Sequence, residues 1–173
     1  MYPVPINEEA RLSQLRAMNV LDSPPSPNFD RLCAIARDHY RVEIAAVSFL
    51  DAERLWFKAS LGLGVREVPR DHAVCNHAIL RDEVLTIPDL MGDGRFRDLP
   101  FVSGPPYLRF YAAAPIVYGP DIRLGSVCIF DRTPRTLDAR AQEVLRHLAG
   151  IAVTELRLIQ TSRAFFRREL AGT

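Results

Sequence analysis

Five short apolar segments run through the middle of the chain, and each ends at a polar or glycine-containing turn. Ile44 to Leu50 is nearly continuous in apolar residues, and the turn 51–53 separates it from the aromatic, alternating segment 55–61. Two apolar runs joined by a short polar turn predict a β-hairpin. The other three segments are 84–89, 110–117 and 124–130, the last two joined by a turn with Gly119, Pro120 and Asp121. We therefore expect an antiparallel sheet.

Helical patterns flank these strands. Asn7 before Glu8 and Glu9 predicts the start of a first short helix, and Ser26 before Pro27 predicts the start of a second. A last helix of about 30 residues is expected from Asp138 to Leu170. Its apolar residues are spaced alternately by four and three positions, at Ala141, Leu145, Leu148, Ala152, Leu156 and Ile159, and continue less regularly to Phe166 and Leu170. This order of elements describes an α+β fold with helices on one face of the sheet.

The domain organisation is simple. The chain has 173 residues, 48% of them hydrophobic and 25% charged, which is ordinary composition for one globular domain. It shows no internal repeat and no change of composition along its length. We predict a single domain over 1–173, with a core at about 7–160 and an extension of the last helix at 160–173.

Charge and cysteine content exclude several classes of protein. The net charge is +1, and no run of like charges indicates a nucleic-acid partner. The single lysine, Lys58, among many arginines could indicate phosphate recognition, but the even spread of the arginines favours a coding bias. No leader and no apolar stretch long enough for a membrane is present, so we expect a cytoplasmic protein without a membrane partner. The three cysteines lie far apart, which supports neither a disulfide framework nor zinc.

The connection from Leu90 to Leu108 is unusual for a loop. It is rich in Gly, Pro and Asp and yet carries Phe96, Phe101 and Tyr107. Large aromatic side chains seldom remain in water, so we predict that the segment 62–108 packs over the sheet as a lid.

Several ordered segments resemble one family. They are SFLDAERLWFKASLGL (48–63), VPRDHAVCNHAIL (68–80), IPDLMGDGRFRDLPFVSGPP (87–106), LRFYAAAPI (108–116) and LGSVCIFDRTPR (124–135). Together they resemble a bacterial GAF domain, in particular the GAF domains at the N-terminus of sensor histidine kinases and diguanylate cyclases. The resemblance implies a five- or six-stranded antiparallel central sheet, with N- and C-terminal helices on one face. It also implies a lid of loops and short helices over a ligand cavity on the other face.

Motifs that would identify a cofactor are missing. The NKFDE-type motif of cyclic-nucleotide-binding GAF domains is absent, and Cys75 with His77 lacks the surrounding bilin-binding signature. The cysteines do not match the placement found in free-methionine-sulfoxide reductases. The cofactor is therefore left unknown. Haem or metal ligation through His72, Cys75 and His77 is the weaker hypothesis, because a histidine on a short apolar helix is more often structural.

The spacing of the candidate catalytic residues argues against catalysis. Cys75, His77 and Asp71 could act as nucleophile, base and orienting group, but positions i and i+2 of a helix do not share a face. We therefore predict no catalytic residue, no metal site and no enzymatic activity. Arg109 could reach an anionic ligand, although a structural bridge to Asp89 or Asp131 is favoured. The predicted ligand-binding residues are Trp56, Cys75, His77, Phe96, Phe101, Arg109, Tyr111 and Cys128.

The resulting hypothesis is a sensory or regulatory domain in signal transduction. It would bind an unidentified small molecule, form a homodimer through a bundle of its first and last helices, and act on a histidine kinase or diguanylate cyclase output. Two alternatives stay open: a thiol-based redox enzyme or sensor using Cys75, and a structural interaction module whose cavity is closed.

Overall fold

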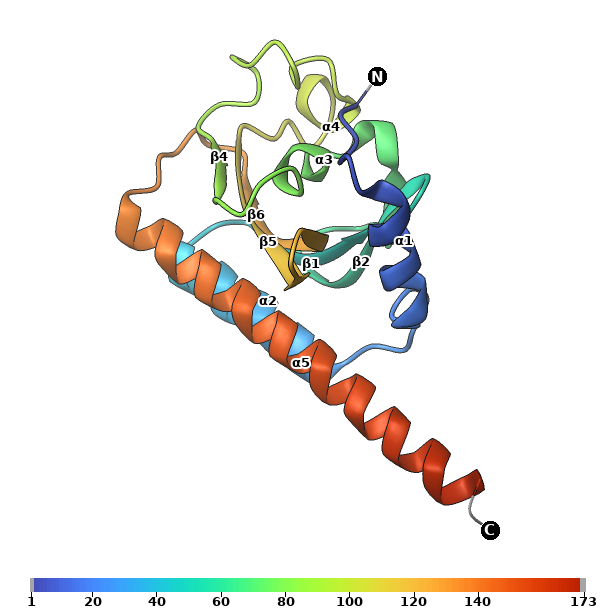
Figure 1. Ribbon diagram of the computed structural model, residues 1–173. Coiled ribbons are helices and arrows are strands. Elements are labelled where there is room, and N and C mark those ends of the chain that lie inside the picture. Colours follow the sequence, from blue (N-terminus) through green and yellow to red (C-terminus); the bar gives the residue numbers. More distant parts are fainter. Residues whose placement is uncertain (1, 172–173) are drawn as a thin grey trace.

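The computed structural model describes the backbone of residues 2–171 and the side chains of residues 2–169. Its centre is one six-stranded antiparallel sheet in the order β3-β2-β1-β6-β5-β4 (Figure 1). The strands are β1 Ile44–Leu50, β2 Arg54–Leu61, β3 Glu67–Pro69, β4 Leu85–Ile87, β5 Phe110–Gly119 and β6 Ile122–Asp131. The predicted antiparallel sheet is confirmed, and the α+β fold class with it.

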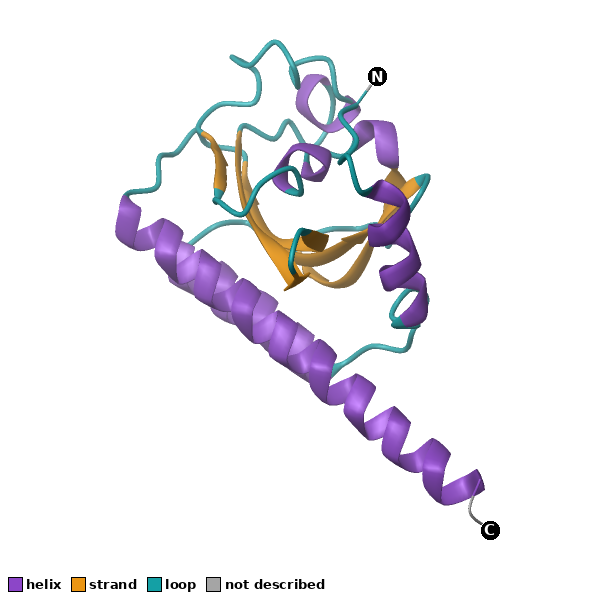
Figure 2. Ribbon diagram, in the orientation of Figure 1, coloured by secondary structure: helices purple, strands orange, loops and turns teal. Residues whose placement is uncertain are grey.

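Helices form a layer on one face of the sheet, and short helices and loops form a lid on the other (Figure 2). The longer helices are α1 Glu8–Ala17, α2 Pro27–Tyr40 and α5 Ala139–Ala171. The lid contains the 3-10 turn Arg70–His72 and the one-turn helices α3 Cys75–Ala78 and α4 Pro100–Ser103. No helix in the described part of the chain combines the length and apolar character needed to cross a membrane.

Strand alternation divides the interior into two cores. In β1, Ala45, Val47 and Phe49 pack against the helical layer, whereas Ile44, Ala46 and Leu50 pack against the lid. Every side chain of β1 is buried for this reason, which explains why its sequence is continuously apolar rather than alternating.

The apolar seam of the last helix belongs to the domain itself. Leu145, Leu148, Ala152 and Leu156 are buried in the core that α5 shares with the sheet. They are therefore not free to form the dimer bundle that the sequence spacing predicted. The helix then continues away from the sheet, where Phe166 is exposed (Figure 1). The side chain of Leu170 lies outside the described residues.

The lid differs in part from expectation. Phe96 is buried within it and Phe101 is partly buried, but Tyr107 is half exposed and is not packed down as predicted. Two hydrogen bonds from Arg109 Nη1, 3.0 Å to the Val102 carbonyl and 2.9 Å to that of Leu108, hold this part of the lid to the start of β5. The predicted bridge from Arg109 to Asp89 or Asp131 is wrong, because the guanidinium binds backbone carbonyls and Asp131 pairs with Arg135.

Gly125 permits the closest approach between the two central strands. A Cβ at this position would lie 1.9 Å from the Ser48 carbonyl oxygen of β1, and 2.8 Å from the Phe49 Cα. Backbone atoms of a paired strand cannot withdraw from such a clash without breaking the ladder.

We expect Gly125→Ala to lower the free energy of unfolding by about 3 kcal/mol or more, as overpacking against backbone does. Gly150→Ala is the matched control, because Gly150 is exposed in α5 with nothing within 4 Å of a Cβ. It should raise the free energy of unfolding by about 0.5–1 kcal/mol. Urea denaturation of both variants measures the difference, and equal effects would contradict the close approach.

Candidate functional site

The centre of the lid face is a buried cluster of thiols and hydroxyls. Cys75 of α3 meets Tyr111 of β5, whose hydroxyl donates a hydrogen bond of 3.0 Å to the Cys75 Sγ. Ser48 Oγ lies 3.9 Å from the same sulfur and 3.4 Å from Ser126 Oγ. Cys128 of β6 lies among these groups, with its Sγ 3.6 Å from the Ala46 carbonyl oxygen. None of the five side chains has exposed surface.

Strand register brings this cluster together. Ser48 pairs with Ser126 across β1 and β6, and Cys128 pairs with Ala46 of β1 and with Ala113 of β5. The small alanine side chains around Cys128 leave room for α3 to place Cys75 over the sheet. The cluster therefore depends on residues from four elements far apart in sequence.

The surroundings favour the thiolate form of Cys75. The neighbouring thiol of Cys128 lowers the pKa of Cys75 most, burial opposes it, and the hydroxyl groups of Tyr111, Ser126 and Ser48 lower it further. The same interaction with Cys75 raises the pKa of Cys128, and burial adds to that effect. Burial also raises the pKa of Tyr111, so this phenol remains a donor. Cys75 is thus the thiol of the pair that loses its proton first.

Access to the sulfurs is closed. All three cysteines are free thiols and buried, and a substrate could reach Cys75 only if the lid moved. Cys33 lies on the helical side, where burial raises its pKa to about 12.

The catalytic triad considered from sequence is not assembled. No hydrogen bond joins Cys75 to His77 in the described part of the chain, and Asp71 lies exposed beside His72, 3.8 Å between Oδ1 and Nε2. His77 packs edge-on against Phe96, with ring centroids 4.9 Å apart. Burial, and then the charge of Arg95, lower the pKa of His77. Among the described residues, no group of three His, Cys, Asp or Glu side chains is placed to hold a metal.

An apolar pocket of about 540 Å³ opens at the edge of the lid face. It lies between the β1–β2 side of the sheet, the connection 62–65 and the segment 100–108. Its lining includes Ile44, Leu55, Phe57, Leu63, Val68, Phe101, Pro105, Leu108 and Phe130. The volume suits a small molecule, and the walls are chiefly apolar with His72 as a polar group.

Only one predicted ligand-binding residue, Phe101, lines this pocket. Cys75, Tyr111 and Cys128 form the closed cluster, while Phe96 and His77 lie inside the lid. Trp56 was placed on the wrong face by the prediction: it packs in the helical core, and Phe57 faces the lid. Alternation along β2 required one of these two rings to face each side but did not say which.

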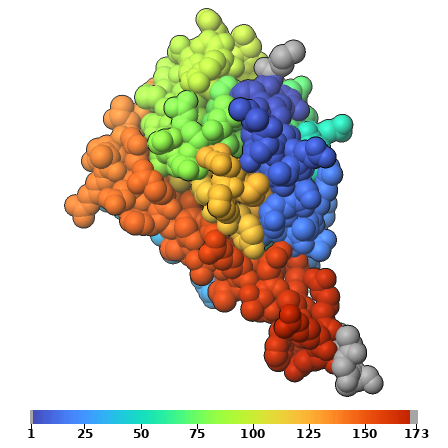
Figure 3. Space-filling model, in the orientation of Figure 1, coloured from blue at the N-terminus to red at the C-terminus, as the bar shows by residue number. Residues whose placement is uncertain are grey.

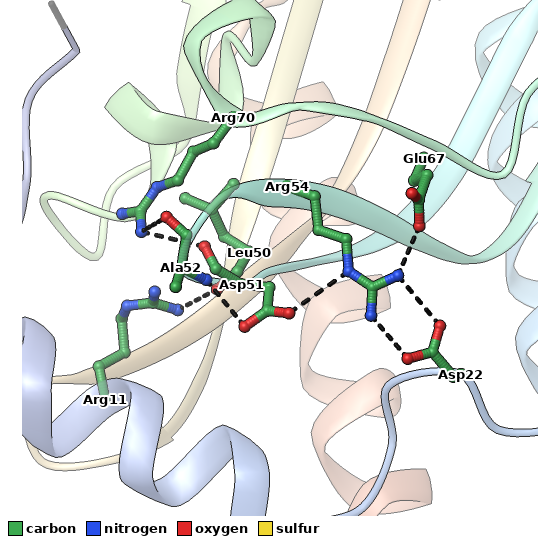
Figure 4. A network of polar contacts seen from close by, with 8 residues as sticks. All are labelled: Arg11, Asp22, Leu50, Asp51, Ala52, Arg54, Glu67 and Arg70. Atoms are coloured by element: carbon green, nitrogen blue, oxygen red, sulfur yellow. Dashed lines mark hydrogen bonds and ion pairs between the residues drawn. The ribbon is translucent and has the colours of Figure 1, made fainter.

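A polar network fixes the turn between β1 and β2 beside this site (Figure 4). The Arg54 guanidinium contacts three carboxylates, those of Asp22, Asp51 and Glu67. Arg11 of α1 donates a hydrogen bond of 2.6 Å to the Leu50 carbonyl, and Arg70 of the lid donates to the Asp51 and Ala52 carbonyls. The turn is thereby tied to both α1 and the start of the lid. The sequence indicated no role for Arg11, which is buried although charged.

The architecture just described is that of a GAF domain. The GAF domain of a phosphoenolpyruvate-protein phosphotransferase from Coxiella burnetii superposes with a TM-score of 0.67 at 14% identity, covering 92% of this chain and 98% of the other. The free methionine-R-sulfoxide reductase of Neisseria meningitidis gives a TM-score of 0.66 at 14% identity, covering 94% and 98%. No protein-family model matches the chain.

One curated relative is similar in sequence. It is the cyclic di-GMP phosphodiesterase PA2567 of Pseudomonas aeruginosa, 35% identical over 161 residues. The alignment covers 92% of this chain but 27% of the relative, so the chain corresponds to about a quarter of that protein.

These similarities overturn the prediction that no enzymatic activity is involved. The relative is named as a phosphodiesterase, and free methionine-R-sulfoxide reductases from Neisseria meningitidis and Thermoplasma acidophilum share the fold. The prediction rested on the spacing of side chains around Cys75 and on missing family motifs, and neither of these reveals a similarity to an enzyme over the whole chain.

The hydrogen bonds to Cys75 lead to a titration that can be measured. Because they stabilise the thiolate, ultraviolet absorbance at 240 nm should show one thiol titrating below the usual cysteine range near 8.5. Tyr111→Phe removes one donor to the thiolate and should raise that pKa, and Cys75→Ser should abolish the transition. Cys33→Ser is the control and should leave the transition in place. A transition that survives in Cys75→Ser would show that another group carries it.

Proposed function

We propose that the chain is a sensory domain that regulates an enzyme of cyclic di-GMP turnover by binding an apolar small molecule in the lid-face pocket. The observation that carries the proposal is the apolar pocket of about 540 Å³ on the lid side of a GAF-fold sheet. The similarity to part of a cyclic di-GMP phosphodiesterase supports the choice of enzyme. A histidine kinase or diguanylate cyclase output, expected from sequence, has less support.

The construction of the pocket suits a regulatory site. One wall is the sheet, through Leu55 and Phe57, and the opposite wall is the lid segment with Phe101 and Leu108. The lid contains only short regular elements, and segments of this kind open more readily than long helices or central strands. A ligand that fills the space would contact both walls and favour one position of the lid.

A chimera tests the proposal. The aligned segment of the Pseudomonas aeruginosa relative is replaced by this chain, and cyclic di-GMP hydrolysis is measured on protein purified from cells. Leu63→Glu places a charge in the pocket and should change kcat/KM by about fivefold or more, the lower range of coupling between sites. Met91→Glu makes the same charge change at an exposed position outside the pocket and should have no effect. Equal rates in the two variants would disprove regulation through this pocket.

A thiol-based function at Cys75 is the second candidate. It is favoured by the hydrogen bond from Tyr111 and the neighbouring thiol of Cys128, which lower the pKa of Cys75, and by the fold shared with free methionine-R-sulfoxide reductases. Because both sulfurs are buried, this function would require the lid to open. The titration of Cys75 described above tests its first requirement.

We also propose that the chain forms a homodimer through the outer face of the helical layer. Helices α2 and α5 run antiparallel, since Asn28 bonds to Glu155 near one end and Tyr40 bonds to the Ala141 carbonyl near the other. On the outer face of α5, Ile151, Leu158 and Phe165 follow at intervals of seven residues and are 53%, 57% and 58% exposed. Ile35 of α2 is also 53% exposed. A heptad-spaced apolar stripe is the pattern that a second helix covers.

The dimer proposal is tested with Ile151→Glu combined with Leu158→Glu. Sedimentation at micromolar concentration should show a dimer for the unchanged chain, and the double variant should dissociate about a hundredfold more readily, because like charges would face each other across the symmetry axis. Met91→Glu serves again as a control, because it adds a glutamate at an exposed position away from this face. A monomeric unchanged chain, or a double variant that remains dimeric, would refute the proposed interface.

A further inference from the structure

A second pocket lies on the opposite face of the sheet, where α5 leaves the domain. Its volume is about 260 Å³, and it is enclosed by the α1–α2 connection and the middle of α5. Figure 3 shows this connection, in blue, beside the red part of α5. Most of the walls are apolar, through residues such as Val20, Pro24, Leu156 and Ile159. The charged groups at the pocket are Lys58 and Arg163, both positive.

Lys58 lies on the helical face of β2, two residues after Trp56, at an irregularity in the strand. Ser48 pairs with Phe57 and Val47 pairs with Ala59, so the register between β1 and β2 skips Lys58. A bulge of this kind leaves one residue unpaired, and here Lys58 and Ala59 both lie on the helical side of the sheet. Lys58 is 8% exposed, and its ammonium lies over the rings of Phe29 and Trp56 at 5.9 Å from each centroid.

The ammonium of Lys58 has neutral hydrogen-bond partners. It donates to Ser23 Oγ at 2.7 Å and to the Pro24 carbonyl at 2.5 Å, and no carboxylate of the described residues forms an ion pair with it. Burial, and then the charge of Arg163, lower the pKa of Lys58, while Asp30 opposes this effect from a distance. A buried cation without an anion is costly, and such a group is normally paired. Three N–H bonds are available to an ammonium, so one donor is left for a further acceptor.

Arg163 is the second unpaired cation. Its Nη1 donates to the carbonyls of Met18 and Asn19 at 2.9 and 3.1 Å, and within the described residues it too has no carboxylate partner. The guanidinium has further N–H donors beyond those two bonds. Ser26, which precedes α2 and makes no side-chain cap hydrogen bond, also borders the pocket. Two cations and a hydroxyl therefore surround an apolar space.

We infer that this pocket binds a small apolar carboxylate, with the carboxylate between Lys58 and Arg163 and the apolar part against Leu156, Ile159 and the prolines. A cavity of about 150 Å³ accommodates benzene, so this one has room for a molecule of about ten heavy atoms. Phosphate alone would satisfy the cations but not the apolar walls, and a neutral apolar molecule would leave the cations unpaired. A bound carboxylate would connect β2 to α5 at the point where the helix begins to project. It would thereby fix the direction of the projecting helix relative to the sheet.

Octanoate is the probe, and octan-1-ol is its neutral counterpart. Isothermal titration calorimetry on the 173-residue chain should show octanoate binding to one site, with octan-1-ol at least about tenfold weaker, because charge-assisted hydrogen bonds are lost. Arg163→Gln and Lys58→Met should each weaken octanoate about tenfold or more. Arg146→Gln is the matched control, since it removes a charge from an exposed position of the same helix and should leave the affinity unchanged.

Further outcomes separate this site from the lid-face pocket. Leu63→Glu should not affect octanoate, whereas a loss of octanoate binding in Leu63→Glu but not in Arg163→Gln would overturn the inference. Equal affinity for octanoate and octan-1-ol would also overturn it, as would no binding of octanoate at all. Arg163→Gln lies on the projecting helix and decides the question even if Lys58→Met fails to fold. Because these measurements use no cyclic di-GMP, they stand whether or not the proposed regulation of an enzyme holds.

Discussion

The pairing of β1 with β6 is the constraint on which the rest of the structure depends. These two strands lie at the centre of the sheet and are covered on both faces, so their buried side chains are uncharged except for Asp131 at the end of β6, which pairs with Arg135. Their close approach at Gly125 sets the register that aligns Ser48 with Ser126 and Ala46 with Cys128. The buried thiol cluster is a direct product of that register.

Strand β2 connects the two faces of the molecule. Phe57 lines the lid-face pocket, and the next residue, Lys58, lines the pocket under the helices. Regular alternation would already direct neighbours to opposite faces, but the skipped register at Lys58 also keeps Trp56 and Ala59 in the helical core. A displacement of this one strand would therefore change the shape of both pockets. The end of β2 nearest the turn is held by Arg54 and its three carboxylates.

The buried thiols and the open pocket offer different chemistry within one lid. The thiols have polar neighbours and no access, whereas the pocket has access and chiefly apolar walls. The fold is shared with a phosphotransferase GAF domain and with a free methionine-R-sulfoxide reductase, so the fold alone does not decide between these uses. A use of the thiols requires that the lid opens a path from solvent to Cys75.

The sequence by itself determined the elements and their order. Apolar runs bounded by turns located the longer strands, and Ser26 with Pro27 located the start of α2, because these signals depend on neighbouring residues alone. It also predicted the α+β class, the GAF fold and a lid.

Tertiary structure decided the rest. Trp56 faces the helical core because it pairs with Phe49 of β1, a register that the sequence of β2 alone does not show. The helical seam ending at Leu156 could pack on its own sheet or on a partner with the same spacing. The pockets combine residues from distant segments, and unpaired cations such as Lys58 and Arg163 become apparent only when the chain has folded and their neighbours are known.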